Sequence, residues 1–199
     1  MLSVGLTGGI GVGKTTVARF FSKRGAFSLD ADKIVHKLFL PDSPVWKQVV
    51  SQWGPSILIP GENKIDRKLL SEIVFKRKNS LKSLLDILYP PLKTEIFKKK
   101  ENASHTGTSI FLVEASQILE AGWNDLFDSI VLVITSFDAR QERLLRNRIL
   151  NNYQIRSRMG FQWPDWVKIR YADFLIDNSG PIWKTKDLVN SIYDQLMKF

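Results

Sequence analysis

The residues best suited to chemistry in this 199-residue chain form a glycine-rich segment near its start. Residues 8–15 read GGIGVGKT and satisfy the pattern G-x-x-x-x-G-K-[ST], which binds nucleotide phosphates where it joins a strand to a helix. Its glycines let successive backbone N–H groups turn inward and approach a phosphate without a Cβ in the way. The segment, called the P-loop below, therefore predicts a site for a nucleoside triphosphate.

The side chains of the P-loop have distinct expected roles. Lys14 should reach the β- and γ-phosphates of ATP, and the Thr15 hydroxyl should be a ligand of Mg²⁺. Glu114, at the end of a later strand, is expected either to hold a water molecule on Mg²⁺ or to cap the turn that follows. The expected nucleotide-binding residues of this segment are Gly8, Gly9, Gly11, Val12, Gly13, Lys14, Thr15 and Thr16, the last placed to contact the α-phosphate.

Two carboxylates, Asp30 and Asp32, follow the second expected strand. In a parallel α/β sheet, residues just past the carboxyl end of a strand face the ligand crevice. A carboxylate there can orient an attacking hydroxyl group and accept its proton, an effect typically worth ~10²–10⁴-fold in rate. Either residue could instead cap the helix that follows. The spacing alone leaves both roles open for Asp32.

Arginines crowd into the segment between residues 140 and 170. The planar guanidinium group pairs with phosphate oxygens and keeps its charge. A helix that carries several arginines beside a P-loop is typical of the mobile lid of small-molecule kinases. A solvated basic face or an RNA contact is the alternative, and for the cluster as a whole we favour the lid. Its members are Arg140, Arg143, Arg146, Arg148, Arg156 and Arg158.

The elements that must position these residues alternate between strands and helices. Apolar runs predict strands at 2–7, 26–30, 109–113, 129–135 and 173–176. Helical spacing predicts helices at 14–24, 30–40, 138–152, 155–161 and 184–197. Residues 44–100 read as mostly helical, with breaks at Gly54–Pro55, Pro60–Gly61 and Pro90–Pro91. This order predicts a three-layer α/β P-loop NTPase fold with a parallel five-stranded sheet.

We expect one kinase unit over residues 1–199, divided into three parts. The nucleotide-binding core should comprise residues 1–40, 104–138 and 171–199. A helical substrate-binding insertion should occupy residues 41–103, and a helical lid residues 139–170.

Composition narrows the possible classes of function. Apolar residues make up 44% of the chain, enough for a sizeable core, and cysteine is absent. The absence of cysteine excludes disulfides, thiolate catalysis and cysteine-based metal sites. No apolar run approaches the ~18 residues that a membrane span needs, and we expect no signal peptide because the amino terminus enters a strand directly. We therefore expect a cytoplasmic protein with no membrane partner, either a monomer or a small homo-oligomer.

The charge balance requires a choice between two kinds of partner. Lys and Arg number 29 against 20 Asp and Glu, giving a net charge of +9, which suits nucleic acids or phosphorylated small molecules. Six tryptophans could serve as stacking platforms for bases. However, Trp163 and Trp166 are expected to pack at the lid hinge, and the others considered lie among apolar neighbours. We therefore expect a phosphorylated small molecule and no nucleic-acid partner.

A GTPase switch is a further alternative, because residues 63–66 spell N-K-x-D, the guanine-specificity motif of that class. That motif needs its aspartate at the end of a buried strand. Here Asp66 follows Pro60–Gly61 in a hairpin-like region and leads into a helix. The D-x-x-G segment at 177–180 also comes after it, the reverse of the order in a switch, so the GTPase is disfavoured.

Several segments together resemble the dephospho-CoA kinase family from one end of the chain to the other. The P-loop with the preceding Leu6 and Thr7 closely matches the family's version, and LDADKI at 29–34 resembles its D-A-D segment. Residues 53–54, 61, 65–70 and 74–75 are similar to its G…G…R…L…F stretch. Further matches are ILE at 118–120, RLL at 143–145, Arg158 with Gln162, AD at 172–173 and DNSG at 177–180.

The resemblance implies that ATP phosphorylates the 3′-hydroxyl of dephospho-CoA, the last step of coenzyme A synthesis. It implies Asp32 as catalytic base, Arg143 as lid arginine, and Asn178 near the adenine ring. Asp32, Arg67 and Tyr89 are the implied substrate-binding residues. The sequence departs from the family at 116–118, which read SQI in place of P-L-L, and at Tyr89, where the family has histidine. It also leaves open whether Arg143, Arg146 or Arg148 is the lid arginine, and whether another small acceptor such as a nucleoside monophosphate is used.

Overall fold

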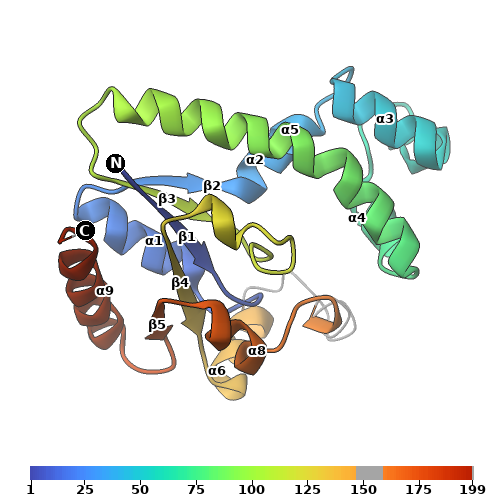
Figure 1. Cartoon of the computed structure of the whole chain (residues 1–199). Helices are drawn as coiled ribbons and strands as arrows, with labels where there is room; N and C mark the ends of the chain where they lie inside the picture. The colour runs from blue at the N-terminus through green and yellow to red at the C-terminus, as the bar shows by residue number, and fades with distance from the viewer. Residues whose placement is uncertain (147–158, 199) are drawn as a thin grey trace. The chain divides into compact units, whose positions relative to one another are not determined.

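The computed structural model of this protein describes residues 1–146 and 159–198. In this part of the chain five strands form one parallel sheet in the order β2-β3-β1-β4-β5 (Figure 1). Their bounds are β1 Leu2–Thr7, β2 Phe27–Asp30, β3 Ile110–Glu114, β4 Ser129–Ile134 and β5 Phe174–Asp177. The expected α/β fold with a parallel five-stranded sheet is confirmed.

Helices connect these strands. The α-helices are α1 Lys14–Lys23, α2 Ala31–Leu38, α3 Pro44–Trp53, α4 Arg67–Val74, α5 Lys78–Ser104, α6 Phe137–Arg146, α8 Asp165–Lys168 and α9 Ile182–Leu196. Short 3₁₀ helices occupy Pro55–Ile57, Asn124–Leu126 and Ile169–Tyr171. Among the residues that the structure describes, none of the helices combines the length and apolar character needed to cross a bilayer.

The chain divides into two compact units, which are described separately. The first comprises Met1–Asp30 and Lys100–Phe199 and contains the sheet. The second comprises Ala31–Lys99 and is helical. The expected division into core, insertion and lid stays a prediction, and residues 147–158 of the expected lid, with Arg148, Arg156 and Arg158, lie outside the described residues.

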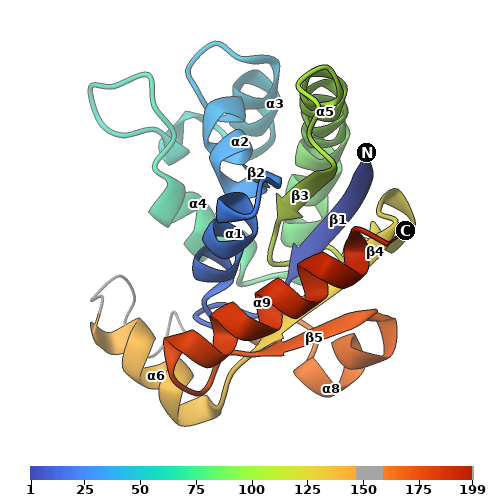
Figure 2. The same ribbon diagram turned by 90° about the vertical axis from the view of Figure 1, so that its left-hand side faces the viewer.

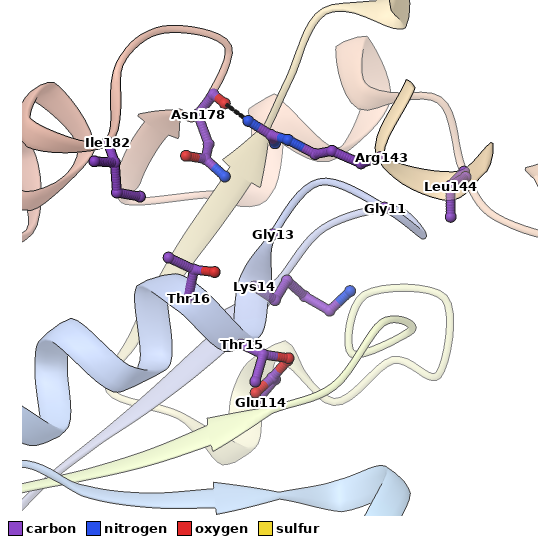
Figure 3. Close-up of a pocket in the computed structure, with 10 residues that line it drawn as sticks. All are labelled: Gly11, Gly13, Lys14, Thr15, Thr16, Glu114, Arg143, Leu144, Asn178 and Ile182. Carbon is purple, nitrogen blue, oxygen red and sulfur yellow. Dashed lines mark hydrogen bonds between the residues drawn. The ribbon is translucent and has the colours of Figure 1, made fainter. Parts of the chain in front are cut away.

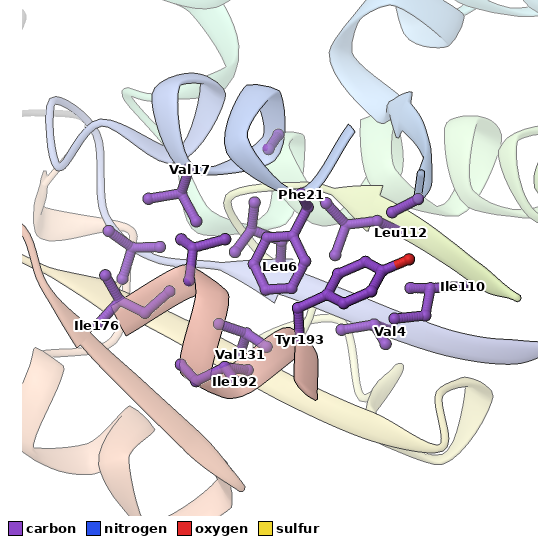
Figure 4. Packing of buried hydrophobic residues seen from close by; sticks show 14 of the residues in the cluster. Val4, Leu6, Val17, Phe21, Ile110, Leu112, Val131, Ile176, Ile192 and Tyr193 are labelled. Carbon is purple, nitrogen blue, oxygen red and sulfur yellow. The ribbon is translucent and has the colours of Figure 1, made fainter. Parts of the chain in front are cut away.

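The core of the first unit lies between the sheet and two helices. α1 and α9 run side by side over one face of the sheet (Figures 1 and 2). Alternate strand residues such as Val4 and Leu6 point to this face, as the two-residue period of a strand requires. They meet Phe21 of α1 and Tyr193 of α9, whose ring centroids are 6.3 Å apart (Figure 4). This packing fixes the position of α1, and with it the P-loop that leads into α1.

The second unit has its own core, built from helices. Val49, Ile57, Leu70 and Leu88 are among its buried members. Asp66 stands at the N-cap of α4 and accepts hydrogen bonds from the backbone N–H groups of the helix's first turn, which orients that helix.

The expected break at Pro90–Pro91 is wrong, because α5 continues through both prolines. A proline inside a helix removes a backbone hydrogen bond and crowds the preceding turn, at a cost of about 3 kcal/mol. The helix nevertheless buries leucines and an isoleucine at four-residue spacing on both sides of the prolines: Leu84, Leu88, Leu92 and Ile96. Burial of each such side chain contributes about 1.5–3 kcal/mol, so tertiary packing outweighs the local preference.

Candidate active site

The P-loop joins the buried end of β1 to the first turn of α1. Gly13 precedes α1 with φ of +91°, a conformation that strains residues with a Cβ. The N–H groups of Thr16 and Val17 both donate to the Gly13 carbonyl, at 3.0 and 3.2 Å, so the helix begins directly at the loop. A helix N-terminus presents backbone N–H groups and the positive end of the helix dipole, so this end of α1 is suited to an anion.

Lys14 folds back over the P-loop. Its Nζ donates to the carbonyl oxygens of Gly8 and Gly9 at 3.0 and 3.2 Å, and the residue is 9% exposed. The ammonium group is thereby held at the concave side of the loop. This is the position from which it can exchange carbonyl partners for phosphate oxygens.

Thr15 and Glu114 form a polar pair beside Lys14 (Figure 3). The Thr15 hydroxyl donates to Oε1 of Glu114 at 2.7 Å, and Glu114 is 8% exposed. The pairing follows from the sheet, because Glu114 ends β3 opposite Leu6 of β1, and the P-loop starts just after β1. Both oxygens are hard ligands of the kind that Mg²⁺ prefers.

Arg143 and Asn178 enclose the other side of the P-loop. Arg143 comes from α6, and its Nη2 donates to the Asn178 carbonyl at 2.7 Å (Figure 3). Its Nη1 lies 3.4 Å from the Val12 carbonyl, which also accepts a hydrogen bond of 2.8 Å from Nδ2 of Asn178. The Asn178 side chain is thus engaged with the protein backbone.

These groups line one cavity of about 390 Å³. Its walls come from the P-loop, the first turn of α1, the end of β3, α6 and the segment after β5. The lining residues are Gly11, Gly13, Lys14, Thr15, Thr16, Glu114, Arg143, Leu144, Asn178 and Ile182. The first unit therefore brings together most of the residues expected to bind the nucleotide, with Arg143.

Arg140 and Gln162 hold the backbone of Ile10 from two sides, a role that the sequence did not reveal. Nε of Arg140 donates to the Ile10 carbonyl at 2.6 Å, and Oε1 of Gln162 accepts the Ile10 N–H at 3.0 Å. The Arg140 guanidinium lies so close to Gly9 that a Cβ there would stand 2.0 Å from Nη2. Burial lowers the pKa of Arg140, and the charge of Asp165 opposes this shift.

The segment that carries Gln162 is anchored by a buried ion pair. Nζ of Lys168 lies 2.8 Å from Oε1 of Glu120, and the Lys168 side chain is fully buried. The same Glu120 oxygen accepts the backbone N–H of Trp163 at 2.8 Å. Glu120 closes the ILE segment that resembles the family, but no spacing in the sequence points to Lys168 as its partner.

Asp32, Arg67 and Tyr89 belong to the second unit. α2 begins at Ala31, so Asp32 lies in the first turn of the helix, which leaves the N-cap position to Asp30. Arg67 contacts the ring of His36, which is one helical turn after Asp32 and shares its face of α2. Arg67 also lies over the Phe39 ring, 5.8 Å from its centroid, and Tyr89 is half-buried on α5.

The N-K-x-D segment has a structural role. Ile59 N–H donates to the Lys64 carbonyl at 2.9 Å, which closes the expected hairpin-like turn, and Asp66 caps α4. The expectation that Trp166 packs at the lid hinge is wrong, because Trp166 is 66% exposed and stands beside Arg170. Trp163 packs against Tyr171 at 5.7 Å between ring centroids.

Comparison with solved structures supports the fold. A dephospho-CoA kinase from Campylobacter jejuni matches with a TM-score of 0.70 at 25% identity, covering 98% of this chain and 97% of that one. A shikimate kinase from Acinetobacter baumannii matches with a TM-score of 0.53 at 13% identity, over 100% of this chain and 94% of that one. The second likeness concerns the fold alone.

Comparison of sequences is more specific. A family model described as dephospho-CoA kinase matches residues 2–184. A dephospho-CoA kinase of Aquifex aeolicus (strain VF5) is 38% identical over 198 residues, covering 100% of this chain and 99% of that protein. One of Syntrophus aciditrophicus (strain SB) is 32% identical over 203 residues, covering 100% of this chain and 84% of that protein. On this match over nearly its whole length, the chain belongs to the dephospho-CoA kinase family.

Proposed function

We propose that the cavity beside the P-loop binds ATP with Mg²⁺, and that Asp32 directs the γ-phosphoryl group onto the 3′-hydroxyl of dephospho-CoA. One observation carries the nucleotide site: the Thr15 hydroxyl and the Glu114 carboxylate are paired at 2.7 Å in the wall of the cavity that Lys14 also lines. A phosphate loop, a cation and a metal-suited oxygen pair are thereby gathered in one place.

The Thr15–Glu114 pair suits Mg²⁺ for a specific reason. Because the Thr15 hydroxyl donates its hydrogen to Glu114, its lone pairs remain available to a metal ion. Thr15 would be a direct ligand, and Glu114 would hold a water molecule of the metal's shell. The contact with Thr15 favours this role of Glu114 over that of a turn cap. When bound, Mg²⁺ would neutralise charge on the β- and γ-phosphates.

The cations on both sides of the loop would act on the phosphates. Lys14 would release the Gly8 and Gly9 carbonyls and bind the β- and γ-phosphate oxygens. Arg143 would neutralise charge that develops on the transferring group, a role for which Arg146 and Arg148 remain alternatives. The Asn178 side chain is held by protein partners, so its part in nucleotide binding would be to shape the cavity wall.

Asp32 would act on the acceptor. The 3′-hydroxyl oxygen bonds to the γ-phosphorus, the bond from that phosphorus to the β,γ-bridging oxygen breaks, and ADP leaves. The hydroxyl proton passes to the Asp32 carboxylate. Asp32 comes two residues after Asp30, which ends β2 opposite Glu114 of β3. This short stretch of chain supports the assignment of Asp32 as the base. Arg67 and Tyr89 would bind the substrate.

A comparison of three acceptors tests the proposal. ADP release should be measured with dephospho-CoA, AMP and adenosine offered separately at saturating Mg-ATP. We expect dephospho-CoA to be strongly preferred, and Lys14→Ala to abolish the reaction while the protein remains folded. A faster reaction with AMP would instead identify a nucleoside monophosphate kinase. The cytoplasmic setting and the monomer or small homo-oligomer stay predictions.

A further inference from the structure

The Asn178 side chain lies in a buried chain of hydrogen bonds that ends on helix α9. Its Nδ2 donates to the Val12 carbonyl at 2.8 Å, and its Oδ1 accepts the Thr185 hydroxyl at 2.8 Å. Asn178 is 3% exposed and Thr185 is 1% exposed. Both ends of the amide are therefore satisfied by protein groups in a place that water reaches poorly.

This chain fixes the orientation of one P-loop peptide. In a planar trans peptide the C=O and the following N–H point in opposite directions. Because Nδ2 of Asn178 holds the Val12 carbonyl, the Gly13 N–H must point the other way. The approach is close: a Cβ on Gly13 would stand 2.3 Å from Nδ2, so only glycine leaves room for the amide.

Thr185 itself is not part of the cavity wall. Ile182, one helical turn earlier on α9, lines the cavity, whereas Thr185 is absent from the lining and meets the Asn178 amide. The Thr185 hydroxyl therefore acts on the cavity through the Asn178 amide that it contacts.

We propose that Thr185 is a positioning residue for ATP, acting through the Asn178 amide on the Val12–Gly13 peptide of the P-loop. The inference rests on the proposed ATP site. The Thr185 hydroxyl holds Oδ1, the amide plane stays fixed, and Nδ2 keeps the Val12 carbonyl turned away from the phosphates. Without the hydroxyl, Oδ1 is a buried acceptor that lacks its donor, and the amide moves to recover one.

A matched pair of substitutions tests this. Thr185→Val keeps the shape of the side chain and removes the hydroxyl, whereas Thr185→Ser keeps the hydroxyl and removes a methyl group. We expect Thr185→Val to raise the KM for ATP about 3- to 10-fold and to leave the KM for dephospho-CoA unchanged, the range that one buried hydrogen bond supports. Thr185→Ser should restore the parent KM for ATP.

Val189→Ala controls for simple loss of stability, because Val189 is fully buried on the same helix. It should lower the melting temperature without a selective rise in the KM for ATP. Direct titration of ATP, without acceptor, gives the second readout, and Thr185→Ala replaces Thr185→Val should the latter fail to fold.

Three results would overturn the inference: an unchanged KM for ATP in Thr185→Val, an equal rise for both substrates, or the same selective rise in Val189→Ala. Failure of the ATP site itself has a different signature, since the parent protein and Lys14→Ala would then bind ATP equally well or equally poorly.

Discussion

The hydroxyl group of Thr15 donates a 2.7 Å hydrogen bond to the carboxylate of Glu114, although the two residues are far apart in the sequence. Parallel pairing of β1 with β3 brings them together, since Leu6 and Glu114 are opposite each other in the sheet. The pairing of the strands thus places the Glu114 carboxylate beside Thr15, the residue that should bind the metal ion. Because both oxygens lie in the cavity wall, their chemistry can be tested through the metal dependence of the reaction.

Glu114→Gln should weaken the response to Mg²⁺ more than the binding of dephospho-CoA. The amide keeps the size of the side chain but has no charge with which to hold a metal-bound water. We expect the Mg²⁺ concentration for half-maximal rate to rise about 10-fold, as is usual when an outer partner of a metal site is lost. The measurement is initial rate against Mg²⁺ at fixed total ATP. Glu101→Gln, on the exposed end of α5, is the matched control and should behave like the parent. An unchanged Mg²⁺ dependence in Glu114→Gln would assign Glu114 to the turn instead.

Local pattern was sufficient to predict the strands and the phosphate loop, because the alternation of a strand and the turns of the loop depend on neighbouring residues. The run at 2–7 contains alternate core residues, and the glycines at 8–13 permit the phosphate loop, so β1 and the start of α1 were predicted where they occur. Long-range contacts could not be predicted in this way. Nothing in the spacing of Lys168 indicates its partner Glu120, which comes from a segment distant in sequence. Thr185 and Asn178 are close in sequence, but their hydrogen bond depends on how α9 packs beside the end of β5.

Local pattern failed outright at Pro90–Pro91. Two adjacent prolines predict a helix break, and the penalty is real, but it is offset by apolar side chains buried along α5 on either side. A prediction from propensity counts only the local cost. The free energy gained by burying apolar side chains depends on which surfaces the helix packs against, and the local sequence does not determine those surfaces.

Gln162→Met should impair the use of ATP through the P-loop. Oε1 of Gln162 accepts the Ile10 N–H at 3.0 Å, and methionine matches the side chain in length but offers only a weak acceptor. We expect kcat/KM for ATP to fall about 2- to 10-fold, the equivalent of one net hydrogen bond. The kcat/KM for ATP of Gln162→Asn should fall by a similar factor, because the shorter asparagine side chain does not reach Ile10. Gln195→Met, on the surface of α9, serves as control. Full activity in both Gln162 variants would show that this contact does not position the loop.

Asp128 makes the stability of the first unit sensitive to acid. The backbone N–H and the hydroxyl of Ser3 both donate to this carboxylate at 2.7 Å. These hydrogen bonds, the backbone one most strongly, lower the pKa of Asp128 below its ordinary value of 3.8. Because the folded pKa is the lower one, the stabilisation is complete above the unfolded value and is lost as the pH falls through the folded value. Asp128→Asn should therefore lose stability near neutral pH and show a shallower decline in strong acid. Urea midpoints between about pH 7 and about pH 2.5 measure this. Parallel pH profiles for parent and variant would remove Asp128 from the acid response.

Asp32→Asn should separate binding from chemistry. The amide preserves the size of the side chain and its place in the first turn of α2, but it is not a base. We expect ATP binding to stay near the parent value and kcat to fall by ~10²-fold or more, as for loss of a general base. Asp30→Asn is the matched control, because it makes the same chemical change at the residue that precedes the helix. That variant should keep both its stability and its kcat near the parent values, because asparagine caps a helix about as well as aspartate does. Single-turnover rates and melting temperatures for both variants decide between the roles. A parent-like rate in Asp32→Asn would remove it as the base, and an equal loss of kcat in both would point to a shared effect of charge at the end of β2.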